Sequence, residues 1–182
     1  YENNKDTYFF DDFVVKSSFD ENRVRTMTIN SPDIIEGKVV GKFQFDQLQK
    51  LIENSLGSLY ANYSPNKVNK GQFLKFDFNV YSKLIEIFYP EISLGENTIM
   101  RGTINSNSDE FKFNFKSPSI KAYDNYLDNI NIDIDNKNTL YNAYIEVDSI
   151  RTKQYKVSNF SLINVTQNDT LLFRTEFKGG EK

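Results

Sequence analysis

The residues that could carry chemistry are few, and their types exclude several kinds of active site. The chain has 182 residues, with no His, no Cys and no Trp. Histidine general-base catalysis, thiol nucleophiles, disulfide scaffolds and Cys/His zinc sites are therefore excluded. The remaining candidates are carboxylates, and Asp133 and Asp135 lie two positions apart, on one face of an expected strand.

Asp133 and Asp135 fit a solvated strand face better than a catalytic or calcium-binding pair. Paired carboxylates can serve in acid–base chemistry or bind calcium. Lys137, however, occupies the next alternate position, where a calcium loop needs an oxygen ligand. The glycines form no phosphate-binding motif. We therefore predict a protein that is not an enzyme and that uses neither a cofactor nor a metal.

The charge and composition point to strands and turns and exclude one class of partner. The 22 basic and 25 acidic residues give a net charge of -3, without a long basic run. A nucleic-acid partner therefore has no electrostatic support. Phe and Tyr number 16 and 11, whereas Ala occurs 3 times and Asn 22 times. Scarce Ala with abundant aromatic residues and Asn favours strands joined by turns over helices.

Apolar and polar residues alternate with a period of two in six segments. These segments span residues 39–45, 74–80, 111–115, 130–134, 141–147 and 171–177. Weaker strands are expected at 9–15, 24–29, 98–104 and 154–163. Successive side chains of a strand point to opposite faces, so each segment has one apolar face and one polar, solvent-exposed face. The pattern predicts a mainly β protein with a curved, largely antiparallel sheet.

The apolar faces of these strands supply the candidate binding site. An uncovered row of so many Phe residues exceeds what a soluble monomer normally exposes. Either the protein closes over them, as in a β-sandwich or barrel core, or they line an open trough that holds acyl chains. The near-uniform strand lengths and the scarcity of helix favour the trough. The candidate groove-lining residues are Val39, Phe43, Phe45, Phe76, Phe78, Phe111, Phe113, Phe115, Ile130, Ile132, Ile134, Ile145, Val147, Phe173 and Phe177.

One segment, 46–60, has helical rather than alternating periodicity. Its leucines and Ile52 recur at helical spacing, and Asp46 is the expected N-cap. We expect this short helix to pack against the sheet edge or to plug one end of the sheet. A second helical turn is expected at 82–88, ended by Pro90. The polar loop 62–71 marks a soft internal break within a single unit spanning residues 1–182.

Several stretches resemble the TamB family, the translocation and assembly module subunit, in its Bacteroidota form. They are FYPEISLGENTIMRGTINS (88–106), YLDNINIDIDNKN (126–138), NFSLINV (159–165) and DTLLFRTEFKGG (169–180). Upstream, GKFQF (41–45) and GSLYANY (57–63) are similar as well. The resemblance covers residues 24–180 and is strongest after residue 84. The short helix departs from a pure strand array, so the resemblance does not establish a continuous groove through residues 46–71.

The resemblance implies a fold, a function and a location. TamB proteins belong with the AsmA-like and bridge-like lipid-transfer proteins, whose repeated strands curl into a "β-taco" with an apolar interior. They are periplasmic, anchored in the inner membrane, and implicated in phospholipid transport to the outer membrane and in outer-membrane protein biogenesis. On this basis the chain is one slice of a longer trough. Its ligands are phospholipid acyl chains, whereas the anchor and the region that binds a TamA-type barrel partner lie outside it.

Two other functions remain open from the sequence. The first is a periplasmic or extracellular β-sandwich that recruits protein partners by adding strands at its edges. The second is a fragment of a transmembrane β-barrel, which is least favoured because Phe recurs in the middle of strands rather than in two girdles.

Overall fold

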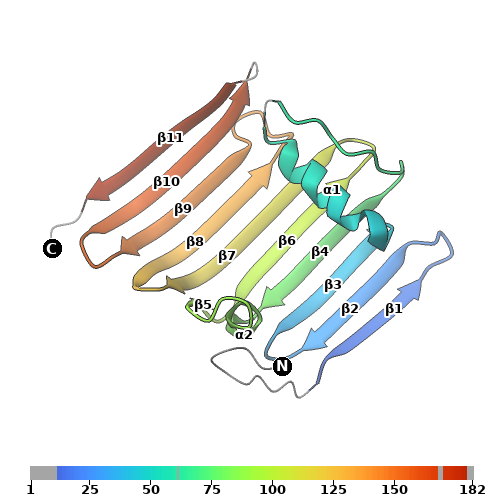
Figure 1. The fold of residues 1–182 in the computed structure, drawn as a ribbon, viewed down its shortest axis with the longest axis horizontal. Helices are drawn as coiled ribbons and strands as arrows, with labels where there is room; N and C mark the ends of the chain where they lie inside the picture. Colours follow the sequence, from blue (N-terminus) through green and yellow to red (C-terminus); the bar gives the residue numbers. More distant parts are fainter. Residues whose placement is uncertain (1–11, 61, 168–169, 180–182) are drawn as a thin grey trace.

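The described part of the chain forms one broad, open antiparallel sheet (Figure 1), together with two short helices. The computed structural model describes residues 12–60, 62–167 and 170–179. The strands are β1 (Val14–Phe19), β2 (Arg25–Ser31), β3 (Ile35–Lys42), β4 (Phe73–Val80), β5 (Ile92–Leu94), β6 (Thr98–Asn105), β7 (Glu110–Ala122), β8 (Asn125–Asp135), β9 (Ala143–Arg151), β10 (Lys156–Gln167) and β11 (Thr170–Gly179). The helices are α1 (Phe45–Gly57) and α2 (Ser82–Glu86).

Over the described residues, the sheet has 11 strands and is not closed. Ten of them follow chain order from β1 to β11, and the short β5 pairs only with β7. All pairs are antiparallel, and β1 and β11 form opposite edges (Figure 1). The prediction of a mainly β fold with an open antiparallel sheet is confirmed, and the architecture is consistent with a curved trough.

The alternating segments become strands, with some shifts at their ends. Segment 39–45 was expected to be extended throughout, but β3 ends at Lys42, so Phe43 and Phe45 leave the sheet and Phe45 opens α1. The three-residue β5 is too short to show a period and was not predicted. The expected strand at 9–15 is described only from residue 12, and β1 begins at Val14; residues 9–11 lie outside the described residues.

The register places apolar side chains on one face and polar side chains on the other. One row across the sheet joins Val39, Phe76, Gly102, Phe113, Ile134 and Ala143. The adjacent row, one residue along each strand, joins Lys38, Asp77, Arg101, Asn114, Asp133 and Tyr144. Because consecutive residues point to opposite faces, the sheet has one apolar and one polar side.

Helix α1 lies on the apolar face, over the middle strands near one end of the sheet (Figure 1). Leu48 and Leu59 pack against the buried cluster of Leu74, Ile104 and Phe111. The helix therefore does not flank an edge strand, which was one of the two expected positions. The expectation that Asp46 caps it is wrong: Gln44 is the N-cap, without a side-chain cap, and Asp46 lies in the first turn.

Side-chain hydrogen bonds tie α1 to the polar loop at 62–71. The Asn54 amide donates to the Asn66 carbonyl at 2.9 Å. The Gln72 amide and the Asn69 backbone N–H both donate to the Gln47 side-chain oxygen at 2.8 Å. Since Gln72 directly precedes β4, these bonds connect the middle and the C-terminal end of the loop to the helix.

Gly37 is the glycine whose replacement is expected to be most damaging. Its φ is +148°, and a Cβ there would lie 2.1 Å from the Asp77 carbonyl oxygen and 2.8 Å from the Phe78 ring. We predict that Gly37→Ala lowers the free energy of unfolding by roughly 2–4 kcal/mol, since it combines backbone strain with overpacking. Urea unfolding measures the change.

Gly71→Ala is the matched control for Gly37→Ala. Gly71 also has a positive φ, +81°, but nothing lies within 4 Å of the added Cβ. Its replacement should therefore cost only the backbone strain, about 1 kcal/mol. Equal losses in the two variants would show that close packing at Gly37 contributes nothing.

Candidate apolar binding groove

A hollow with wholly apolar walls lies between α1 and the sheet. Its volume is about 460 Å³, within the range of roughly 300–1,000 Å³ typical of small-molecule sites. The lining residues are Met27, Val39, Phe43, Phe45, Leu48, Ile52, Leu56, Leu74, Phe76, Phe78, Met100, Ile104, Phe111, Phe113 and Ile134. We call this space the α1 hollow.

The walls of the α1 hollow come from the sheet and from one side of the helix. Alternate residues of β2, β3, β4, β6, β7 and β8 supply the floor. Leu48, Ile52 and Leu56 of α1 supply the wall, at the i, i+4, i+8 spacing that places them on one side of a helix. Ile52 and Leu56 stay 44% and 46% exposed. The helix therefore does not seal the space against the sheet.

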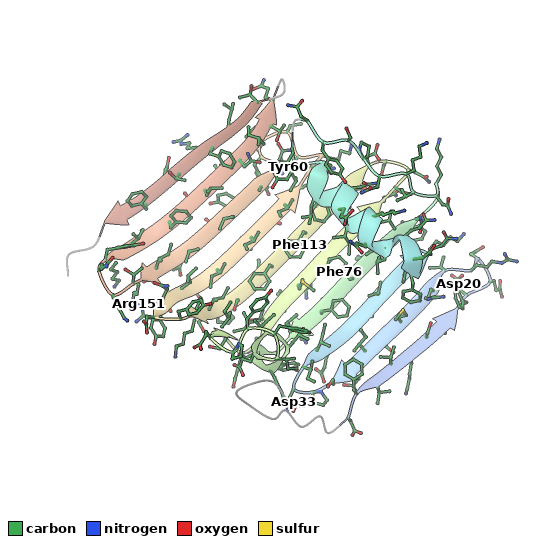
Figure 2. The ribbon with its side chains drawn as sticks, viewed as in Figure 1. Asp20, Asp33, Tyr60, Phe76, Phe113 and Arg151 are labelled. Atoms are coloured by element: carbon green, nitrogen blue, oxygen red, sulfur yellow. The ribbon has the colours of Figure 1, made fainter. Side chains whose placement is uncertain are left out.

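Four phenylalanine rings of β4 and β7 form a large part of the floor. Phe76 and Phe113 lie on the face that α1 crosses (Figure 2), with their ring centroids 6.4 Å apart. Phe78 stacks beside Phe76 at 6.1 Å, and Phe111 beside Phe113 at 6.5 Å. Gly102 lies between Phe76 and Phe113 in the row, and the Phe76 ring covers it, since a Cβ there would lie 2.3 Å from that ring. These contacts create a continuous aromatic surface.

About half of the predicted groove residues line the α1 hollow. They are Val39, Phe43, Phe45, Phe76, Phe78, Phe111, Phe113 and Ile134. Phe78 and Phe111 are only 8% and 5% exposed, so neighbouring side chains cover most of their surface. Phe43 reaches the hollow from the β3–α1 connection and Phe45 from the first position of α1, with their rings 5.5 Å apart, although the alternating pattern predicted a strand for both.

The other predicted residues lie beyond the hollow, toward the β11 edge. Phe115, Ile132 and Ile145 form one cross-strand row, and Ile130 pairs with Val147. Ile130 and Val147 are 4% and 3% exposed and so belong to the packed core. Phe173 and Phe177 are on the edge strand β11 and are 64% and 60% exposed.

Sequence reasoning missed the helix wall and part of the floor. Ile52, Leu56 and Leu48 had been assigned to packing alone, although their shared helical face was visible in the sequence. Met27 and Met100 sit in strands that were expected but carried no site residue. The alternation of Met27 with polar neighbours was the available signal, and it was too weak to show that this strand borders a cavity.

The opposite face carries paired charges. Arg101 contacts Asp77 at 2.9 Å, and Lys112 contacts Glu110 at 3.1 Å and Asp135 at 3.5 Å. The hydrogen bond to Glu110, helped by the charge of Asp135, raises the pKa of Lys112. The hydrogen bond from the Tyr144 hydroxyl to Glu146 raises the pKa of Tyr144 to about 12. Asp133 and Asp135 belong to this polar face, and the described residues contain no cluster of three or more potential metal ligands.

The fold and the hollow together describe an open single-sheet protein with one partly covered apolar face. No helix within the described ranges is long and apolar enough to cross a bilayer. Comparison of the chain with protein-family models, curated proteins and solved structures finds no match.

Proposed function

We propose that this chain binds phospholipid acyl chains on its apolar face, as a segment of a TamB-type periplasmic lipid-transfer protein. In this proposal the groove conducts phospholipid between the inner and outer membranes and supports outer-membrane protein biogenesis. The observation that carries the proposal is the α1 hollow, a space of about 460 Å³ lined only by apolar side chains.

The chemistry of the lining selects a hydrocarbon ligand. No lining side chain offers a hydrogen bond or a charge. A polar ligand would lose its bonds to water without replacement, which costs several kcal/mol for each buried polar group. A hydrocarbon chain loses nothing of this kind and gains the transfer of its own surface from water. The ligand portion inside the hollow is therefore an acyl chain rather than a polar metabolite.

The apolar surface also continues beyond the hollow, which suits an elongated ligand. Ile134 at its border is followed on the same strand and face by Ile132, and β9 adds Ile145 opposite Ile132. Ile132 and Ile145 remain partly exposed. The surface thus extends across several strands instead of ending at a closed pocket wall.

A protein-interaction module remains the second candidate because both sheet edges are accessible. All residues of β1 are exposed, as are all residues of β11 except Leu171. Such edges can accept an added strand from a partner. This function predicts capture of a partner that is insensitive to changes in the α1 hollow, which separates it from lipid binding.

A charge on the helix wall tests the lipid proposal. Phospholipid should be found by mass spectrometry after organic extraction of the purified folded chain. In Ile52→Asp, a bound acyl chain must desolvate the new carboxylate, so the lipid bound per chain should fall roughly tenfold or more. Ile52 is 44% exposed, and its loss leaves the buried Leu51 in place.

Gln49→Asp is the matched control for Ile52→Asp. It introduces the same carboxylate on the same helix, at an exposed residue outside the lining of the hollow. Its lipid content should equal that of the unmodified chain. Absence of phospholipid from the unmodified chain, or equal lipid in both variants, would contradict the proposed function.

A further inference from the structure

One cationic side chain, Arg25, projects onto the apolar face beside the α1 hollow. Arg25 on β2 pairs with Gly41, and Gly41 pairs with Leu74, a member of the buried cluster. Met27, which is two residues further along β2, lines the hollow. Arg25 therefore shares the face of Met27 and Leu74 rather than the polar face.

The guanidinium of Arg25 rests on three aromatic rings. Its central carbon lies 4.6 Å from the ring centroid of Phe45, 4.7 Å from that of Phe19 and 5.7 Å from that of Phe43. Phe43 and Phe45 also line the α1 hollow. The positive charge is thus held at the rim of a space whose lining is entirely apolar.

Within the described part of the chain, Arg25 differs from the other arginines of the sheet, because each of those has an acidic partner and Arg25 has none. Arg101 pairs with Asp77, Arg151 with Asp128 and Arg174 with Glu176. Among the residues that the structure describes, no carboxylate lies within ion-pair distance of Arg25. The rings compensate part of the cost of the half-buried charge. They accept no conventional hydrogen bond from the guanidinium N–H groups, and no acceptor for these groups is found among the described residues.

We propose that Arg25 binds the phosphate of a phospholipid whose acyl chain occupies the α1 hollow. The proposal rests on the proposed function and adds the headgroup site to it. A guanidinium presents donors in a geometry that matches phosphate oxygens bidentately. A ligand that combines a phosphate with a hydrocarbon chain complements both neighbouring features, the unpaired cation and the apolar hollow.

Calorimetric titration with three probes separates the two parts of the ligand. Palmitoyl lysophosphatidic acid has both chain and phosphate, monopalmitoylglycerol has the chain alone, and glycerol 3-phosphate has the phosphate alone. The two lipids are added below their micelle-forming concentrations. We expect the lysophosphatidic acid to bind most tightly, the monopalmitoylglycerol more weakly, and the glycerol 3-phosphate not measurably.

Arg25→Gln should weaken lysophosphatidic acid binding about tenfold, the effect of losing one charge-assisted contact. It should leave monopalmitoylglycerol binding unchanged. Arg25→Lys keeps the charge and should lose less. Arg101→Gln removes the same type of side chain from the polar face and should change neither affinity. For the unmodified chain, added salt should weaken the binding of lysophosphatidic acid alone, a measurement that does not depend on the folding of any variant.

Each remaining outcome overturns a defined part of the argument. If both lipids bind equally well and without salt dependence, Arg25 is not a headgroup site, although the acyl-chain site stands. If glycerol 3-phosphate binds as tightly as the lysophosphatidic acid, Arg25 is a general anion site and the inference fails. If neither lipid binds, the proposed function and the inference fall together.

Discussion

Replacing Phe111 by alanine is expected to lower the free energy of unfolding by about 3–5 kcal/mol. Phe111 is 5% exposed and packs with Leu74 and Ile104 beneath α1. Removing its ring deletes contacts with both the sheet and the helix, and the surrounding backbone cannot collapse into the space because strand pairing holds it. Urea unfolding followed by circular dichroism measures the change.

Phe115→Ala provides the matched comparison for Phe111→Ala. Phe115 lies on the same strand and face, is only partly buried, and is outside the cluster of Leu74, Ile104 and Phe111. This replacement should lower the free energy of unfolding by only about 1–2 kcal/mol, because Phe115 buries less apolar surface than Phe111 does. Similar losses at the two positions would mean that the sheet face is uniformly packed and has no distinct core under the helix.

Phe113→Asp is expected to remove nearly all bound phospholipid, at least tenfold, while the chain remains folded. Phe113 lies two residues from Phe111, but it is only partly buried and forms part of the floor of the α1 hollow. Its carboxylate can stay hydrated when the hollow is empty, whereas a bound acyl chain would strip it of water. Lipid extraction and mass spectrometry of the folded variant measure the effect.

Asn114→Asp controls for the charge introduced by Phe113→Asp. Asn114 is the next residue on β7, points to the polar face and forms a row with Arg101 and Asp133. This variant should keep its lipid. If Phe113→Asp retains lipid as well, the hollow is not the binding site. If it unfolds, and the neutral Phe113→Leu is also strongly destabilised, Phe113 belongs to a closed core and the groove interpretation is wrong.

The period-two pattern predicted most of the sheet because it is a local property of the chain. Alternation such as that of Phe111, Phe113 and Phe115 with Lys112, Asn114 and Lys116 fixes which residues share a face, whatever the strand pairs with. A helix was predicted at 46–60 for the same reason, from leucines at helical spacing, and α1 is found at Phe45–Gly57. Strand β5 has only three residues, which is too few to show an alternating pattern. The positions of Phe43 and Phe45 could not be predicted because they depend on where β3 ends.

Partial burial was decided only by tertiary structure. Phe111 and Phe113 are equivalent in sequence and both line the α1 hollow, yet Phe111 is 5% exposed and belongs to the buried cluster, whereas Phe113 is only partly buried against it. The surroundings of Arg25 were also decided by tertiary structure. Its neighbours in the sequence gave no sign that three aromatic rings would surround its guanidinium. Contacts of this kind join residues far apart in the chain.

The sequence alone determined the β class, the two-faced strands and the absence of histidine and cysteine chemistry, since these follow from residue types and from backbone geometry along a single segment. Only the tertiary structure decided that the sheet stays open, that α1 spans its apolar face without filling it, and that a cation lies at the rim. Those features depend on how distant segments pack, and the free energy of that packing is not encoded in the periodicity of any one strand.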